Sequence, residues 1–176
     1  MVSSIFLLCL VLIFQSNHVS AASYPSTTAT VEPGDILVTK TTNCKDEDEC
    51  KGITGHAGIV IDNTYAVHIS GPGANPERIS ISEWFEEYHS TKVVRADSKY
   101  RGDPSKAATW AEEYVKDFSH ADYSVTANIA SKDPTYCSKL VYQAYYSTGY
   151  PIVATSGIIH PYEFLKKGDI VTSENW

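Results

Sequence analysis

The sequence lacks any run of lysine and arginine residues, and its formal net charge is −7 at pH 7. Proteins hold nucleic acid or anionic lipid headgroups through basic patches, so the charge excludes both as electrostatic partners. After the first 22 residues no apolar run is long enough to span a membrane, and no stable membrane insertion is expected. Internal repeats and low-complexity segments are also absent. With 43% apolar and 20% charged residues, the chain of 176 residues is expected to fold as one domain.

The N-terminal segment contains one apolar run, Ile5 to Phe14, which is too short to cross a bilayer as a helix. Polar and then small residues follow it, in the order typical of a signal-peptide core and its cleavage site. No lysine or arginine precedes the run, so an interfacial anchor is the alternative. We therefore predict a secreted protein with a signal peptide over 1–22, a Ser/Thr/Pro-rich arm over 23–33 and a folded domain over 34–176.

Cysteine is scarce, with four residues in all, and Cys9 lies within the predicted signal peptide. Three cysteines then remain in an oxidising compartment, so one thiol is unpaired or pairs between chains. Cys44 and Cys50 bracket a short acidic loop and are predicted to form a disulfide. That loop lacks the glycine and the spaced acids of a calcium-binding loop, so we expect a solvated loop and no metal site. Cys137 is left over, either as an inert core residue or as a functional thiol.

Hydrophobic periodicity predicts helices mixed with short strands, which defines an α+β fold. Asp103 and Pro104 mark the start of one helix, and a second helix begins near Thr135 and ends before Gly149. Strands are expected at 34–40, in a hairpin over 56–69, at 78–81 before a helical turn capped by Ser82, at 91–97, and at 170–172 after a short helix.

The second helix places Cys137 in its first turn. Unpaired backbone N–H groups and the positive end of the helix dipole favour a thiolate at such a position, so the pKa of this thiol is predicted to be low. The same N–H groups can stabilise an oxyanion when a carbonyl carbon is attacked. The hydroxyl of Tyr136 is a further candidate donor to that oxyanion.

Two of the six histidines, His56 and His68, flank a tight turn. If the turn consists of residues 62–64, His68 faces Gly58 and both imidazoles lie on one face of the hairpin. A two-residue turn would shift the register by one and send the imidazoles to opposite faces. In the first register Gly58 leaves the space between the rings open. His56 can then act as a general base while His68 holds its second nitrogen.

Four short stretches carry a resemblance to a known superfamily: "GDILVTK", "GHAGIVI", "AVHIS" and "YCSKLVYQAY". They resemble the motifs of the NlpC-like superfamily of papain-fold cysteine hydrolases, with the cysteine helix moved to the C-terminal side. This circularly permuted order is that of YaeF/YiiX-like permuted amidases and of lecithin-retinol acyltransferase relatives. The resemblance implies a papain-like fold, in which an antiparallel sheet packs against helices and the cysteine starts a helix. It further implies Cys137 as nucleophile, His56 as general base and His68 as the residue that orients His56, with no metal or cofactor.

The function implied by this resemblance is a secreted cysteine hydrolase that cleaves an amide bond through an acyl-enzyme on Cys137. Its expected partner is a small-molecule or peptide substrate, such as a cell-wall stem peptide, an isopeptide or an N-acyl compound. The stretch "YCSKLV" departs from the N-C-E-H-F-V pattern of the acyltransferase branch, which disfavours lipid acyl transfer. Two alternatives stay open: a thiol-dependent lipid or thioester acyl hydrolase or acyltransferase, and a secreted binding module without activity.

Overall fold

The computed structural model describes residues 22–42, 54–97, 99, 102–153, 157–174 and 176. Most of the predicted signal peptide, together with Cys44 and Cys50, lies outside these residues, so the signal peptide and the disulfide remain predictions. The elements in chain order are β1 (Ile36–Thr39), β2 (His56–Val60), β3 (Tyr65–His68), β4 (Glu77–Ser80), α1 (Ile81–Glu87), β5 (Thr91–Ala96), α2 (Pro104–Asp117), α3 (Cys137–Tyr146), the 3-10 helix η1 (Pro161–Lys166) and β6 (Gly168–Glu174).

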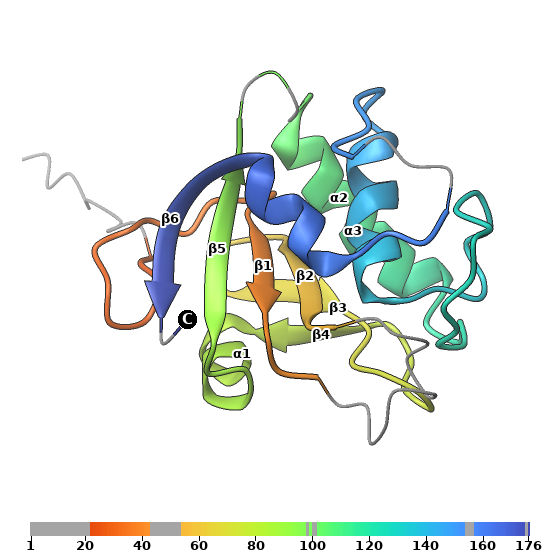
Figure 1. Ribbon diagram of the computed structural model, residues 1–176, viewed down its shortest axis with the longest axis horizontal. Helices are drawn as coiled ribbons and strands as arrows, with labels where there is room; N and C mark the ends of the chain where they lie inside the picture. Colours follow the sequence, from red (N-terminus) through yellow and green to blue (C-terminus); the bar gives the residue numbers. More distant parts are fainter. Residues whose placement is uncertain (1–21, 43–53, 98, 100–101, 154–156, 175) are drawn as a thin grey trace, which may run out of the picture.

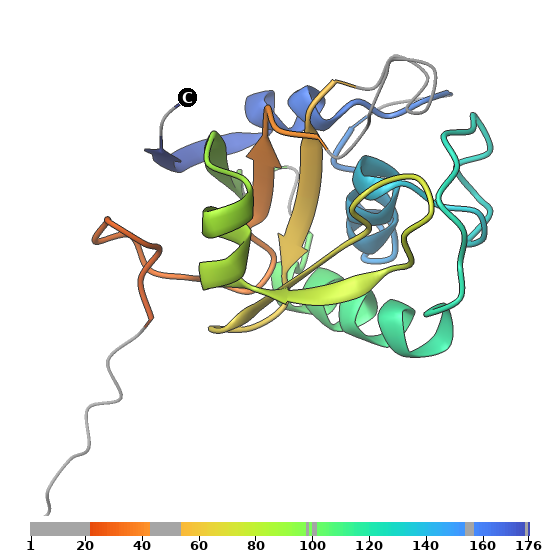
Figure 2. The ribbon, with the colours of Figure 1, turned by 90° about the horizontal axis from the view of Figure 1, so that it is seen from below.

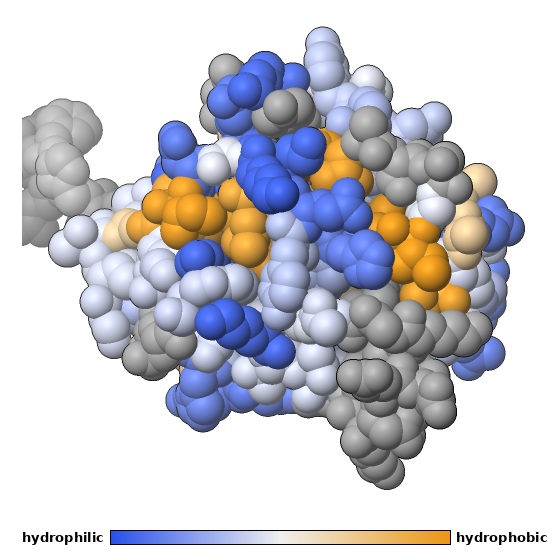
Figure 3. All heavy atoms as spheres, in the orientation of Figure 1, coloured by the Kyte–Doolittle hydropathy of each residue, from blue (hydrophilic) through white to orange (hydrophobic). Residues whose placement is uncertain are grey.

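The strands form one antiparallel sheet in the order β4-β3-β2-β1-β5-β6. Helices α2 and α3 cover one face of it, while α1 and the N-terminal segment lie on the other (Figures 1 and 2). The predicted α+β class, with an antiparallel sheet packed against helices, is confirmed. In the view of Figure 3 the apolar surface is divided into separate patches by hydrophilic side chains.

Both faces of the central strands are buried, because an apolar core lies on each side of the sheet. In β1, Ile36 and Val38 point into the core beneath α2 and α3, whereas Leu37 points into the core beneath α1. A strand buried on both faces carries a continuous apolar run. We call the first core the helix-side core and the second the α1-side core, and the site described below lies between them.

The N-terminal caps of two helices follow ordinary capping rules. Asp103 caps α2, as predicted, since its carboxylate accepts a hydrogen bond from the Lys106 amide. Helix α1 is capped by Ser80 and not by Ser82. Ser80 forms a capping box with Glu83, in which each side chain bonds the backbone N–H of the other residue.

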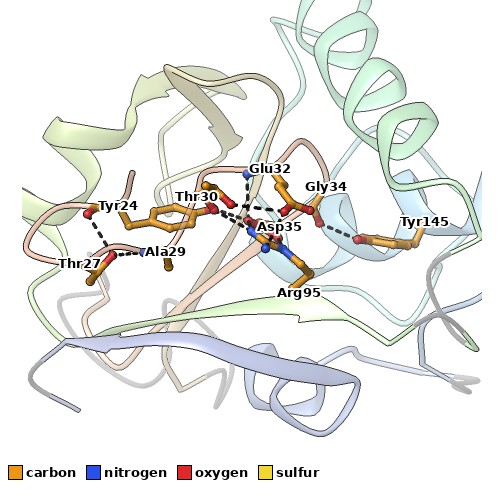
Figure 4. A network of polar contacts seen from close by, with 9 residues as sticks. All are labelled: Tyr24, Thr27, Ala29, Thr30, Glu32, Gly34, Asp35, Arg95 and Tyr145. Atoms are coloured by element: carbon orange, nitrogen blue, oxygen red, sulfur yellow. Dashed lines mark hydrogen bonds and ion pairs between the residues drawn. The ribbon is translucent and has the colours of Figure 1, made fainter. Parts of the chain in front are cut away.

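The segment over 23–33, predicted as an arm, packs onto the α1-side core. Tyr24 is 1% exposed, and its hydroxyl donates to the carboxylate of Asp35 at 2.7 Å. Arg95 binds the same buried carboxylate through two N–H groups, at 2.9 and 2.8 Å, and pairs with Glu32 at 2.7 Å (Figure 4). This network joins the segment to β5 across the start of β1.

Candidate active site

The hairpin of β2 and β3 adopts the register that brings the two histidines together. Ile59 pairs with Val67, Val60 pairs with Ala66, and the Ile61 N–H donates to the Tyr65 carbonyl. The turn therefore contains three residues, as the first of the two predicted registers requires. His56 Nε2 and His68 Nδ1 lie 2.9 Å apart, and both side chains are buried. One ring nitrogen donates a hydrogen bond to the other.

Two aromatic residues of the α1 region enclose the imidazole pair, and the sequence did not identify either of them. Trp84 stacks on the His56 ring, with the centroids 5.2 Å apart and the planes at 18°, and the Tyr88 centroid lies 5.0 Å from that of His56. A Cβ atom on Gly58 would approach the Trp84 ring to 2.8 Å. The expected open space beside Gly58 is thus occupied by Trp84, and the glycine is needed for the indole.

Burial keeps both imidazoles neutral near pH 7. Desolvation lowers the pKa of His56 well below 6.5, and the neighbouring His68 lowers it further. Desolvation also lowers the pKa of His68, to about 4, although the carboxylate of Glu87 acts in the opposite direction. A neutral His56 is able to accept a proton, which is the state that a general base requires.

A carboxylate lies on the outer side of His68. Glu77 is the cross-strand partner of His68 in β4, and its Oε1 is 3.6 Å from His68 Nε2. Burial and the nearby Glu87 raise the pKa of Glu77. The sequence predicted a strand in this region but did not pair it with the strand of His68, and so it gave no role to Glu77.

Helix α3 begins at Cys137, which is 1% exposed. Its N-cap, Tyr136, makes no side-chain capping hydrogen bond, so side-chain capping does not occupy the N–H groups of the first turn. The hydroxyl of Tyr136 instead accepts a hydrogen bond from the Ile159 N–H at 2.9 Å, which ties the helix start to the segment before η1. A role for this hydroxyl at an oxyanion remains a prediction.

The thiol approaches the imidazole pair through the backbone of β2. The described pairing of β2 with β3 covers only Ile59 and Val60, and the Val60 N–H faces β1, where it donates to the Asp35 carbonyl. The N–H groups of successive residues in a strand point to opposite sides, so the Ala57 N–H points toward β3. No pairing of Ala57 with a residue of β3 is described. The Ala57 N–H lies near enough to the Cys137 sulfur to lower the pKa of the thiol. The described hydrogen bond of Sγ goes to the Ser138 hydroxyl at 4.0 Å, so the structure brings the two histidines together but describes no contact of either imidazole with Sγ.

The predicted low pKa of Cys137 is wrong for this arrangement. Burial raises the pKa of the thiol, and this effect outweighs the polar interactions with the Ala57, Ser138 and Cys137 amides and with the Ser138 side chain, which lower it. The helix terminus acts as expected, but its effect is smaller than the cost of placing an anion in a buried site. Thiol and imidazole are consequently both neutral at rest.

A hollow of about 660 Å³ lies near the start of α3, and neither Cys137 nor the two histidines are among its lining residues. One wall, residues 73–75, follows His68 in the chain, and another, Asp133 and Pro134, lies three to four residues before Cys137. The Asn75 side chain joins two walls by donating to the Ala121 carbonyl at 3.2 Å. Tyr123 connects the hollow to the thiol electrostatically, because its pKa is raised by burial and then by Cys137. The lining of the hollow is mainly polar and consists of Gly73, Ala74, Asn75, Asp122, Tyr123, Ser124, Asp133 and Pro134.

Comparison with known proteins identifies a family and a fold. The sequence model of the family described as "Lipoprotein N-acylation protein LnsA-like" matches residues 1–167. An uncharacterised 30.3 kDa protein of Bacillus thuringiensis is 34% identical over 146 residues, which cover 76% of this chain and 52% of the relative. The chain thus spans about half the length of that relative.

A solved structure resembles the fold at low sequence identity. The crystal structure of the metalloprotein yiiX from Escherichia coli O157:H7 matches with a TM-score of 0.50 and 16% identity, covering 70% of this chain and 69% of that one. The predicted YiiX-like fold is confirmed at this level. Over the described ranges, no group of three or more His, Cys, Asp or Glu side chains is arranged to hold a metal ion. In the same part of the chain, no helix is both long enough and apolar enough to cross a membrane.

Proposed function

The chain belongs to the Lipoprotein N-acylation protein LnsA-like family, and from this premise we propose that it is a cysteine-dependent acyltransferase that forms an amide on an amine acceptor. The acyl group travels on Cys137. His56 is the general base and His68 orients it. The family match and the YiiX-like fold support a cysteine hydrolase or acyltransferase type of function, and the name of the family favours transfer to nitrogen.

One observation carries the assignment of residues: the 2.9 Å contact between His56 Nε2 and His68 Nδ1, beside the peptide that lies near the Cys137 sulfur. With Nε2–H of His56 donated to His68, Nδ1 of His56 is unprotonated and can receive the thiol proton. Because thiol and imidazole are both neutral at rest, the proton moves when substrate binds and not before. Catalytic hydrogen bonds commonly form only in the substrate complex.

In the first half-reaction the sulfur attacks the carbonyl carbon of the acyl donor as His56 takes the thiol proton. Backbone N–H groups at the start of α3 stabilise the oxyanion. The oxyanion collapses, the bond to the leaving group breaks, and His56 gives its proton to that group, which leaves a thioester on Cys137.

In the second half-reaction an amine nitrogen attacks the thioester, and His56 takes a proton from this nitrogen. The carbon–sulfur bond breaks, the amide is released, and the proton returns from His56 to the sulfur. The hollow near the start of α3 contains Asp122 and Asp133 and no basic side chain in its lining, which suits an acceptor that arrives as an ammonium group and loses one proton to solvent before its nitrogen attacks.

Amide hydrolysis is the second candidate, and the mainly polar lining of the hollow favours it because such a lining suits water. Water then replaces the amine as the attacking group, and the donor is an amide such as that of a cell-wall peptide. Both candidates share the nucleophile, a permuted papain-like arrangement of the site, and secretion directed by residues 1–22.

Acyl-enzyme trapping tests the proposal. Purified protein is incubated with p-nitrophenyl esters of short and long acyl chains and analysed by intact mass, and a peptide with a free α-amine is then added. We expect a single acyl adduct on Cys137 and its transfer to the peptide, with the N-acetylated peptide as the unreactive control. Cys137→Ala is expected to abolish the adduct, and His56→Asn is expected to slow its formation.

The remaining outcomes separate the alternatives. Release of free acid without transfer supports the hydrolase, and a cell-wall peptide digest then identifies the amide substrate. An adduct that persists in Cys137→Ala would overturn the assignment of the nucleophile. A Cys137 thiol that acquires no acyl group from any ester, and no greater reactivity than free cysteine, would indicate a binding module.

A further inference from the structure

Beyond the two histidines lies a buried nitrogen without a hydrogen-bond partner. His68 is 1% exposed, its Nδ1 faces His56, and its Nε2 makes no hydrogen bond. A buried polar atom left unpaired costs about 1–3 kcal/mol, so native proteins normally satisfy such atoms. The neighbour described for this nitrogen is Glu77 Oε1, at 3.6 Å.

The backbone fixes this neighbour in place. Glu77 is directly opposite His68 in the ladder of β3 and β4, so the two side chains leave the sheet on the same face. The Glu77 side chain is 57% exposed, and a change of rotamer that shortens the 3.6 Å separation would give Nε2 its missing acceptor. The adjacent Arg78 is paired with Asp62 at 3.7 Å and lies over the Tyr65 ring.

A carboxylate at this position selects one tautomer of His68. It accepts only, so it favours a proton on Nε2 and leaves Nδ1 of His68 without one. That Nδ1 must then accept from His56, which places the His56 proton on Nε2. His56 Nδ1 is thereby left unprotonated, in the form that takes a proton from the Cys137 thiol.

We propose that Glu77 is a positioning residue of the catalytic site, acting through His68 to fix the tautomer of His56. The contacts run from Glu77 through His68 to His56, and the last step, from His56 to Cys137, belongs to the proposed function. This inference rests on the proposed function for its catalytic meaning, but the tautomers of the two imidazoles can be measured in the resting protein without any turnover.

Other charged or titratable groups face His68 from two neighbouring elements. His56 approaches from β2, while Glu87 and the Tyr88 ring approach from α1. Glu87 acts on His68 and on Glu77 through its charge, and the described ion pair of His68 is with Glu77. A variant at Glu87 therefore separates an electrostatic effect from an effect of contact.

The experiment measures imidazole tautomers by ¹⁵N-resolved NMR in wild type and in Glu77→Ala, Glu77→Gln and Glu87→Gln. Glu86→Gln, on the exposed face of α1, is the matched control for loss of one negative charge. In wild type we expect the Nε2–H tautomer at both histidines. Glu77→Ala should mix the tautomers, whereas Glu77→Gln should retain them through its amide oxygen, and the Glu87 and Glu86 variants should also retain them.

The acyl-transfer rate is measured on the same proteins. Glu77→Ala is expected to lower kcat by roughly ten- to a hundredfold, the range found for the outer hydrogen-bond partners of metal-bound histidines, whose tautomer is fixed in the same way. KM should be little changed, and Glu77→Gln should restore most of the rate. Unchanged tautomers in Glu77→Ala would overturn the inference even if the protein is an active enzyme. Altered tautomers in a protein without acyl transfer would uphold the contact and refute the proposed function instead.

Discussion

The imidazole pair should make the folded protein sensitive to acid in a defined pH range. An unfolded chain protonates His68 near pH 6.5, whereas burial lowers the pKa of the folded state to about 4. Between these values the unfolded state binds more protons than the folded state, so stability rises with pH. The free energy of unfolding should therefore fall as the pH is lowered from about 6.5 to about 4, and the contribution of His68 should then level off.

The structure sets the size of this effect. A fall in pKa from 6.5 to about 4 corresponds to about 3 kcal/mol, at about 1.4 kcal/mol for each pH unit. A typical domain is stable by only about 5–15 kcal/mol, so the loss is large enough to measure by guanidinium unfolding. Carboxylates also titrate in this range, and a difference between variants removes their contribution.

The assay compares wild type with His68→Gln at pH 7, 6, 5 and 4, and uses His89→Gln as the control because His89 is exposed. Between pH 7 and pH 4 the free energy of unfolding of wild type and of the control should each fall by about 3 kcal/mol more than that of His68→Gln. An equal pH dependence in all three proteins would show that His68 is not buried as a neutral imidazole, and the proposed tautomer chain would then lose its basis.

Three further perturbations test other parts of the structure. Arg95→Met leaves the buried carboxylate of Asp35 without its cation and should destabilise the fold by about 3 kcal/mol. The measurement is the Tm, and an unchanged Tm would contradict the network. Gly58→Ala places a methyl group 2.8 Å from the Trp84 ring, so the free energy of unfolding should fall by about 1–3 kcal/mol and acyl transfer should slow. Full activity of this variant would mean that the indole moves freely. Because burial raises the pKa of Cys137, the rate of its alkylation by iodoacetamide should be low at pH 5 and rise through alkaline pH. Fast labelling at pH 5 would indicate a thiolate–imidazolium ion pair at rest.

The hairpin was the most predictable part of the site, since only two turn lengths were open. Asp62 decides between them: its carboxylate accepts from the Thr64 amide at 2.7 Å and from the Tyr65 amide at 2.8 Å. An aspartate that bonds the backbone two and three residues later is an Asx-type turn signal. This signal was present in the sequence and would have favoured the three-residue turn, and with it the contact between His56 and His68.

The surroundings of the histidines could not be predicted in the same way. Trp84 and Tyr88 reach the site from α1, and their position depends on how that helix packs across the sheet. Local periodicity does not contain this information. The pKa of Cys137 was misjudged for a related reason: the helix start was visible in the sequence, but the burial that opposes it arises from long-range packing.

The division of the site between two cores affects how the site responds to amino-acid substitutions. Helix α3 brings the thiol from the helix-side core, whereas Trp84 packs on the imidazoles from the α1-side core, and strand β2 lies between the two cores. Because each group is packed in a different core, we expect a substitution in one core to disturb mainly the group that this core holds. The spacing between nucleophile and base should be most sensitive to changes that bend β2 itself, such as proline or an inserted residue in its first half.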